Sequence, residues 1–263
     1  MINDIVTLEE HSDTIAILNM QDLVNKNTFT DEFVTKMVEK LRMIHSNTNY
    51  KAVIIKGLPE IFSAGASKDA LRELAGGKAQ VKDFILSELL VEIPVPVIAA
   101  MEGGAVGGGL VIGLCCDIVI MNQRCLYGGG FLNLGFTPGM GYTRLLQGLV
   151  GEYFAGEMMY TGDLYKGRVF KEKGLVNYIL PKNEIWPKAV DLAEIIAEKP
   201  RGTLVTLKYS IGLKKRQLLA EARVHEDFMH TITFNQPETQ KLIETNYPVI
   251  TTKAGDARNP ISE

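Results

Sequence analysis

The alternation of apolar and polar stretches along the chain predicts strands and helices that follow one another from the N-terminus. Residues 4–20 alternate well enough for two strands joined by a turn at Ser12–Asp13. A helix is expected next, with Thr28 or Thr30 as its N-cap, because apolar residues then recur at helical spacing. These apolar residues are Phe33, Val34, Met37, Leu41 and Ile44.

The next part of the chain repeats the order of strand, loop and helix. KAVIIKG and VPVIAAM are short apolar runs typical of buried strands. Between them, FSAGASKDALREL predicts a loop that runs into a helix, which either Ser63 or Ser67 caps. AGGKAQ indicates a break after this helix, and VKDFILSELLVEI predicts an amphipathic helix that ends at Pro94.

A glycine-rich stretch at residues 101–121, MEGGAVGGGLVIGLCCDIVIM, predicts a buried strand, a loop with open backbone, a buried helix and another strand. Glycines in such a loop let the backbone approach a ligand and leave N–H groups free at a helix start. A tight turn between packed elements explains the pattern equally well. The glycines are Gly103, Gly104, Gly107, Gly108 and Gly109.

The chain beyond residue 121 becomes progressively more helical. A second glycine triplet at Gly128–Gly130 is followed by the loop FTPGMG, which runs into a helix. Residues 153–181 indicate helix, turn, helix and short strand, and nearly everything from Glu184 onward is helical, with a last helix beginning at Pro237.

Strands that alternate with helices, followed by an all-helical end, predict an α/β core with a C-terminal helical region. We place the core at residues 1–195 and the helical region at residues 196–250. The polar tail at residues 251–263 has no periodicity and is expected to be disordered.

The composition and charge of the chain exclude several kinds of partner and site. The 28 Lys and Arg against 31 Asp and Glu give a net charge of −3 without a basic block, which argues against nucleic acid and anionic membranes as partners. No apolar run reaches the length of a membrane span, and the N-terminus lacks a signal-peptide pattern. Cys115, Cys116 and Cys125 are expected to be core residues of a cytoplasmic protein, and no metal site is predicted.

Two stretches, FSAGASK and GGAVGGGLVIGLCCDIVI, resemble the oxyanion-hole segments of the crotonase (enoyl-CoA hydratase/isomerase) superfamily. TPGMGYTRLLQGLVG, EMMYTGDLYKGRVFKEKGLVNYIL and KPRGTLVTLK also match the usual order of that family. The glycine cluster is neither a dinucleotide fingerprint nor a P-loop, because GxGxxG and a following GK[ST] are both missing.

The resemblance implies a spiral of ββα turns, a homotrimer or a hexamer, and a thioester substrate on a pantetheine arm. In the family, one backbone N–H from each segment binds the thioester oxygen. Carried over, these donors are Ala66, after Gly65, and Gly108, the middle glycine of GGG. Losing one such donor typically costs roughly 3–4 kcal/mol of transition-state stabilisation.

The two glutamates that hydratases of the family use as general base and acid are missing. The resemblance places them at Val111 and Phe131, the latter four residues after Tyr127. Water addition without either carboxylate would forgo about 10²–10⁴ from each proton transfer, so we predict that this is not a hydratase. Val111, Tyr127 and Phe131 are expected to line a dry pocket, and for Tyr127 and Phe131 core packing is the alternative. Such a pocket suits decarboxylation, which needs no general base.

GASKDAL, IPVPVIAAM, GFTPGMG, YTGDLYKG, LVTLK and MHTITFNQPE look like the decarboxylating members of polyketide β-branching cassettes. This closer resemblance implies a 3-methylglutaconyl substrate on an acyl carrier protein, a dienolate intermediate and a 3-methylcrotonyl-type product, without a further cofactor. It also implies that His230 orients the departing carboxylate or supplies the proton. A hydrogen-bonded histidine at a helix–core contact is the alternative, and His225 points elsewhere on the same helix.

Some of these decarboxylases use a lysine in the loop after GASK. At the expected position this chain has Leu74, which is predicted to line the pocket, and Lys78 is the nearest candidate for a catalytic lysine. A solvated loop lysine is the alternative for Lys78. Lys68 is expected to contact either the pantetheine arm or solvent.

Two other functions stay open at this point. One is a CoA-linked hydratase, isomerase or hydrolase whose acids lie elsewhere in the chain. The other is a crotonase-fold protein that binds acyl carriers or other partners without turnover.

Overall fold

The computed structural model describes residues 4–76, 84–173 and 176–252, and its larger sheet confirms the predicted strands. The first two strands form the expected antiparallel hairpin, and all the other neighbours in this sheet are parallel. In order across the sheet, the six strands are β1 (Val6–Ser12), β2 (Ile15–Met20), β4 (Ala52–Lys56), β7 (Val97–Met101), β9 (Ile118–Asn122) and β12 (Tyr178–Leu180).

A smaller sheet and a short strand pair complete the β-structure of the described residues. The smaller sheet has the order β11 (Leu164–Lys166), β10 (Leu126–Gly128), β8 (Gly104–Val106) and β5 (Ile61–Ser63), with only β11 antiparallel to its neighbour. The pair is β3 (Thr28–Phe29) with β6 (Gly65–Ala66), in parallel.

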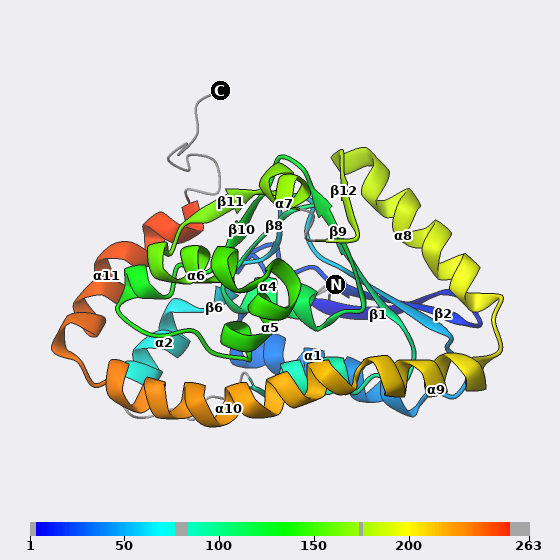
Figure 1. Ribbon diagram of the computed structural model, residues 1–263, viewed down its shortest axis with the longest axis horizontal. Helices are drawn as coiled ribbons and strands as arrows, with labels where there is room; N and C mark the ends of the chain where they lie inside the picture. Colours follow the sequence, from blue (N-terminus) through cyan, green and yellow to red (C-terminus); the bar gives the residue numbers. More distant parts are fainter. Residues whose placement is uncertain (1–3, 77–83, 174–175, 253–263) are drawn as a thin grey trace.

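The chain passes from the larger sheet to the smaller sheet and then into a helix, and it does so repeatedly (Figure 1). The order is β4, β5, α2, then β7, β8, α4, then β9, β10, α5, so the predicted ββα spiral is confirmed. The helices of this part are α1 (Asp31–Ser46), α2 (Lys68–Ala75), α3 (Phe84–Val91), α4 (Gly108–Cys115), the 3₁₀ turn η1 (Leu132–Leu134), α5 (Tyr142–Val150), α6 (Glu152–Thr161) and α7 (Gly167–Lys173).

Side-chain caps fix where two of these helices begin. The Thr30 hydroxyl accepts a hydrogen bond from the Phe33 N–H at 3.2 Å, and Ser67 caps α2 in the same way through Ala70 at 3.1 Å. The other two candidate caps, Thr28 and Ser63, lie in β3 and β5 instead.

The short strands of the smaller sheet and of the β3–β6 pair were not predicted, and β8 and β11 are two examples. β8 lies within the stretch expected to be an open loop, and β11 lies where a turn between two helices was expected. Three residues are too few to show a period in the sequence, so these strands are defined by pairing with β10, which lies between them.

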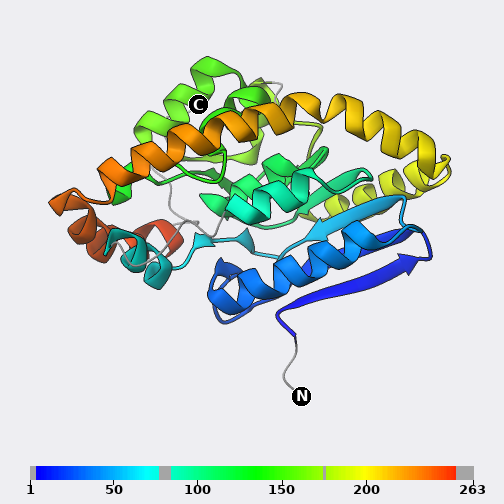
Figure 2. The ribbon, with the colours of Figure 1, turned by 90° about the horizontal axis from the view of Figure 1, so that it is seen from below.

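The C-terminal helices pack on the larger sheet and on the helices of the core. α8 (Lys182–Ala197) packs on the larger sheet, α9 (Arg201–Ile211) leads into α10 (Leu213–Thr233), and α11 (Pro237–Thr252) contacts α2 and η1. Figure 2 shows α9 and α10 following one another along the length of the molecule, with α11 and α2 side by side at one end.

The predicted domain limits can be placed on these helices. The limit between residues 195 and 196 falls in the last turn of α8. α11 ends at Thr252, beyond the start of the tail predicted from residue 251, and residues 253–263 lie outside the described residues. Within the described ranges, none of the helices is both long and apolar enough to cross a membrane.

Candidate active site

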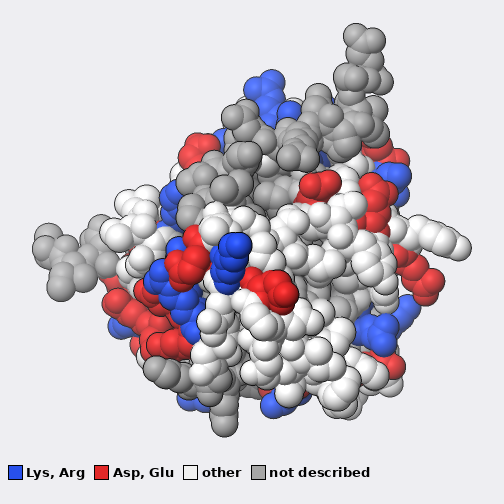
Figure 3. Space-filling view, turned by 90° about the vertical axis from the view of Figure 1, so that its left-hand side faces the viewer, with Lys and Arg blue, Asp and Glu red and all other residues white. Residues whose placement is uncertain are grey.

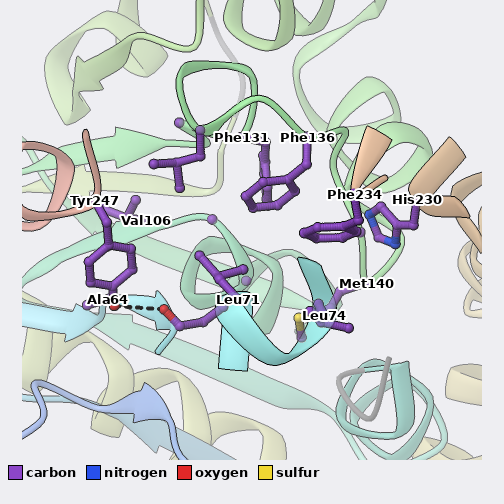
Figure 4. A pocket seen from close by; sticks show the side chains of 16 residues that line it. Ala64, Leu71, Leu74, Val106, Phe131, Phe136, Met140, His230, Phe234 and Tyr247 are labelled. Carbon is purple, nitrogen blue, oxygen red and sulfur yellow. Dashed lines mark hydrogen bonds between the residues drawn. The ribbon is translucent and has the colours of Figure 1, made fainter. Parts of the chain in front are cut away.

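An apolar cavity lies between β6, α4, η1 and the C-terminal helices (Figure 4). Of the described residues that line it, only His230 and Tyr247 carry side-chain nitrogen or oxygen atoms, and none carries a carboxylate. The lining residues are Ala64, Ala66, Leu71, Leu74, Val106, Gly107, Gly108, Gly130, Phe131, Leu134, Phe136, Gly139, Met140, His230, Phe234 and Tyr247.

The two predicted oxyanion-hole segments meet at this cavity. Gly65 has φ +78°, and a Cβ added to it would lie 2.5 Å from the Val106 carbonyl oxygen and 3.2 Å from the Gly108 nitrogen. Glycine is therefore required at this position both by backbone conformation and by the close approach of the second segment. Ala66 and Gly108 consequently lie in the wall of one cavity, although their segments are separated in the sequence.

Gly108 is the first residue of α4, so its N–H has no intrahelical acceptor. Among the hydrogen bonds of the described residues, none has this N–H as its donor. At the other end of α4, the Lys215 ammonium donates to the Cys115 carbonyl at 3.2 Å and to the Cys116 carbonyl at 2.5 Å. The helix thus directs its partial positive end toward the cavity, and a cation covers its partial negative end.

His230 enters the cavity wall from α10 with 7% of its surface exposed. Its Nε2 lies 2.9 Å from the Thr137 carbonyl oxygen, and a carbonyl only accepts, so Nε2 carries the proton. Nδ1 is buried without a hydrogen-bond partner among the described residues. Burial lowers the pKa of His230 below 6.5, so near neutral pH its ring is uncharged and Nδ1 is a vacant acceptor.

The loop that contacts His230 is held by a buried carboxylate on the same helix. Fully buried Glu226 accepts from the Gly141 N–H at 2.7 Å, from the Thr143 N–H at 3.0 Å and from the Thr143 hydroxyl at 2.6 Å. Met140 in this loop has φ 63°, which non-glycine residues rarely adopt. Glu226 therefore stabilises a strained backbone that presents Met140 and Gly139 to the cavity.

Sequence reasoning did not identify Glu226. The signal was a carboxylate in the apolar phase of the helix, because Leu219, Ala222, Glu226 and His230 recur at helical spacing and are all buried. A buried acid at such a position requires hydrogen-bond donors from a neighbouring element.

Glu226→Gln is expected to lower the free energy of unfolding by about 1–3 kcal/mol, because one amide oxygen cannot accept all three hydrogen bonds and a buried donor is left unpaired. Urea denaturation measures this difference. Glu221→Gln is the matched control: this carboxylate is on the same helix, lies 3.7 Å from Arg144 of α5 and is mostly exposed, so its loss should change stability by no more than about 0.5 kcal/mol. Equal losses in the two variants would contradict the assigned role.

The remaining predicted site residues divide into two groups. Leu74 and Phe131 line the cavity, whereas Val111 and Tyr127 are fully buried in the core and do not. The structure thus corrects their expected place: α4 is buried on all sides around Val111. The Tyr127 hydroxyl donates to the Met101 carbonyl and accepts from the Asn122 N–H, so it belongs to the core between the sheets.

Of the two predicted lysines, Lys68 lies within the described residues, and it is not among the residues that line the apolar cavity. The Lys68 ammonium pairs with the Glu244 carboxylate at 2.9 Å. Figure 3 shows that charges of both signs lie together on one face of the molecule. Lys68 lines a second cavity instead. Lys78 lies outside the described residues.

The second cavity adjoins the first and is polar. It is formed by the loop before β3, the start of α1 and α2, and it shares Ala64 and Tyr247 with the apolar cavity. Its lining residues are Val24, Asn25, Lys26, Thr28, Phe29, Thr30, Asp31, Ala64, Ser67, Lys68, Asp69, Ala70, Glu73 and Tyr247.

Metal ligands do not gather in the described ranges, where no group of three or more His, Cys, Asp or Glu could hold an ion. Cys115 and Cys116 are buried, and burial raises the pKa of the Cys115 thiol to about 11. These two cysteines are therefore protonated core residues near neutral pH, in agreement with the sequence analysis.

Ala66 and Gly108 lie in the wall of one apolar cavity, an arrangement typical of enzymes of acyl or enolate chemistry, in which fixed backbone donors stabilise a developing oxyanion. The sequence profile of the enoyl-CoA hydratase/isomerase family matches residues 10–247, and the chain belongs to this family.

Three relatives show which members it resembles. It is 35% identical over 247 residues to the bacillaene synthase decarboxylase PksI of Bacillus subtilis, covering 94% of this chain and 99% of the relative. The ECH2 decarboxylase domain of CurF from Lyngbya majuscula superposes with a TM-score of 0.88 at 34% identity, covering 93% of this chain and 100% of that domain. A structure from a dehydratase/decarboxylase couple of polyketide β-branching gives a TM-score of 0.90 at 35% identity, with coverages of 92% and 99%.

Proposed function

We propose that this protein is a decarboxylase that converts a 3-methylglutaconyl-type thioester on an acyl carrier protein into a 3-methylcrotonyl-type product in polyketide biosynthesis. The observation that carries the proposal is an apolar cavity beside two oxyanion segments, with no carboxylate among its described lining residues. The decarboxylase relatives, similar over nearly the whole chain, support the same reaction.

In the proposed reaction the bond between the substrate carboxylate and the acyl chain breaks, and its electron pair moves into the conjugated thioester as carbon dioxide leaves. The resulting dienolate oxygen accepts hydrogen bonds from the N–H groups of Ala66 and Gly108. Phe131, Phe136 and Leu74 exclude water from the cavity, which strengthens these hydrogen bonds and leaves no positioned water to add to the double bond.

One proton must be added to a dienolate carbon, and His230 is placed to supply it. The uncharged ring gains a proton when a carboxylate approaches, because a nearby negative charge favours the imidazolium. After carbon dioxide has left, the imidazolium gives that proton to carbon and the ring returns to its uncharged form. Reaction of one carboxylate and one proton thus yields carbon dioxide and the neutral acyl product. Lys78 stays a prediction for a second group that would orient the carboxylate.

The two adjoining cavities suit a substrate with two unlike parts. The acyl chain fits the apolar cavity, and the amide-rich pantetheine arm fits the polar cavity, where Lys68, paired with Glu244, is one of the lining residues that would contact it. Beyond that arm, the reaction as written uses no cofactor. We place the protein in the cytoplasm, where carrier-bound intermediates are processed.

Mass spectrometry of the carrier-bound substrate tests the function. Incubation with the protein should remove the mass of one carbon dioxide and leave the thioester intact. A substrate that stays unchanged, while the dehydratase that supplies it is active in the same preparation, would exclude the proposed reaction. Hydration of crotonyl-CoA would instead favour the hydratase alternative.

We also propose that the protein forms a homotrimer or hexamer. An apolar stripe of Val224, Phe228 and Ile232 recurs every four residues on the exposed side of α10, and each of these side chains is at least half exposed. A second copy of the chain would bury this stripe.

Phe228→Asp is expected to dissociate the oligomer, because the interface would have to bury an unpaired charge. Size-exclusion chromatography with light scattering measures the mass. Tyr153→Asp, on the almost fully exposed Tyr153 of α6, is the control and should keep the mass of the unmodified protein. A monomer before any substitution would contradict the proposal.

A further inference from the structure

Tyr247 stands where the two cavities meet. It projects from α11 and lines both the apolar and the polar cavity, and Ala64 is the other described residue that does so (Figure 4). Tyr247 is the larger of these two side chains, so its ring provides most of the side-chain surface that the two cavities share. This shared wall is apolar toward Leu71 and Leu74, which pack in the same cluster.

The hydroxyl of Tyr247 is bonded to the oxyanion segment itself. It donates to the Ala66 carbonyl at 2.9 Å. Burial raises the pKa of Tyr247 to about 12, and the backbone of Lys68 acts in the opposite direction. The hydroxyl is therefore protonated throughout the neutral range and remains a donor to Ala66.

The hydrogen bond from Tyr247 fixes the C-terminal side of Ala66, whereas the Gly65 N–H fixes the preceding residue by donating to the Ser63 hydroxyl at 3.2 Å. β6 is two residues long and pairs only with the equally short β3. Directly after it, Ser67 turns the chain into α2. A displaced Ala66 carbonyl would rotate the adjoining backbone, including the N–H that is proposed to bind the thioester oxygen.

α11 is clamped to α2, which keeps Tyr247 in place. The Glu244 carboxylate accepts from the Arg72 guanidinium at 2.5 and 2.8 Å and pairs with Lys68, and these cations lower the pKa of Glu244 to about 2. The Gln240 amide donates to the Ala75 carbonyl at 3.3 Å. Tyr247 thus lies on a C-terminal helix, α11, that is held against α2 by several hydrogen bonds and ion pairs.

We propose that Tyr247 is a positioning residue with two separable parts: its hydroxyl aims the Ala66 arm of the oxyanion hole, and its ring keeps water of the polar cavity out of the acyl cavity. The inference rests on the proposed function for the identity of the thioester. The thioester group itself would lie at the junction, beside Tyr247, with its acyl chain on one side and its arm on the other.

Two substitutions of Tyr247 test the role of its hydroxyl and the role of its ring separately. Tyr247→Phe keeps the ring, so kcat should fall about tenfold, the effect of one lost orienting hydrogen bond, while KM changes less than about twofold. Tyr247→Ala also opens the wall, so hydrolysed free acid should appear beside the decarboxylated thioester in mass spectrometry. Tyr160→Phe, on a highly exposed tyrosine of α6, is the control and should behave as the unmodified protein.

Hydrogen exchange of the peptide around Ala66 is independent of the substrate. It should be faster in Tyr247→Phe, whereas exchange in the larger sheet should not change. Unchanged kcat and unchanged exchange in Tyr247→Phe would overturn the role of the hydroxyl, and absence of hydrolysis by Tyr247→Ala would overturn the role of the ring. If the unmodified protein does not decarboxylate the substrate, the proposed function fails, and the exchange experiment still decides whether Tyr247 fixes Ala66.

Discussion

Gly65→Ala is expected to lower kcat for decarboxylation by about 10²–10³-fold, the loss typical of an oxyanion hole that has lost one donor. The added Cβ would lie 2.5 Å from the Val106 carbonyl oxygen and 3.2 Å from the Gly108 nitrogen, and both are backbone atoms. The two segments would have to separate, which would move apart the Ala66 and Gly108 N–H groups that we propose bind the thioester oxygen. Steady-state kinetics with saturating carrier-bound substrate measures the effect.

Backbone strain alone would also destabilise this variant, because φ at Gly65 is +78°. Gly151→Ala separates strain from the clash. Gly151 has φ +76° between α5 and α6, but a Cβ there meets no atom within 4 Å. Both variants should lose stability in urea, by about 1–3 kcal/mol for a non-glycine residue at positive φ, and only Gly65→Ala should lose activity. Equal activity of the two variants would show that the contact of Gly65 with Gly108 does not form the catalytic site.

The sequence predicted elements whose signals are local. Thr30 and Ser67 cap helices through residues three positions on, and such signals are readable without the fold. The sequence alone could not decide whether Thr28 or Thr30 caps α1, because Thr28 is held by pairing with Gly65 in β6. The same long-range pairing explains why the short strands of the smaller sheet escaped prediction.

The cavity wall was predicted only in part, for a related reason. Phe131 and Leu74 were expected, whereas Phe136, Phe234 and Tyr247 were not. Phe136 and Phe234 stack with ring centroids 4.7 Å apart, although they lie in distant segments. An aromatic residue in a helical pattern has the same sequence signal whether it fills a core or lines a cavity.

The two positions that lack a hydratase glutamate turn out to differ. Val111 packs inside the core, whereas Phe131 faces the cavity and packs edge-on against Phe136 and Tyr142, at centroid distances of 5.8 and 5.0 Å. The exclusion of water from the cavity therefore depends on Phe131 more than on Val111. Resemblance alone placed both residues at equivalent points of the reaction, and only the fold distinguishes them.

His230→Gln is expected to lower kcat about 10²–10⁴-fold, because proton transfer to the dienolate would lose its donor. The amide can still donate to the Thr137 carbonyl, so the loop should keep its place and substrate binding should be retained. His225→Gln is the matched control, since His225 is exposed on the same helix. Equal kcat in all three proteins would exclude His230 as the proton donor.

The pH dependence follows from the lowered pKa of His230. A donor must be protonated, so kcat/KM, which reports the free protein, should fall as pH rises through a pKa below 6.5. The fall of kcat with rising pH should occur at a higher pH than the fall of kcat/KM, because the substrate carboxylate favours the imidazolium in the complex. Both pH-dependent falls, in kcat/KM and in kcat, should be missing in His230→Gln and present in His225→Gln.

The same shift predicts how stability changes with pH. The folded pKa lies below the unfolded value, so below about pH 6.5 the unfolded chain binds more protons and His230 destabilises the fold as pH falls. Between pH 7 and 5, the unmodified protein should therefore lose more free energy of unfolding than His230→Gln does. Urea titrations at the two pH values measure this difference. An equal loss in both proteins would mean that His230 is solvated when folded, and would remove the basis for its place in the dry cavity.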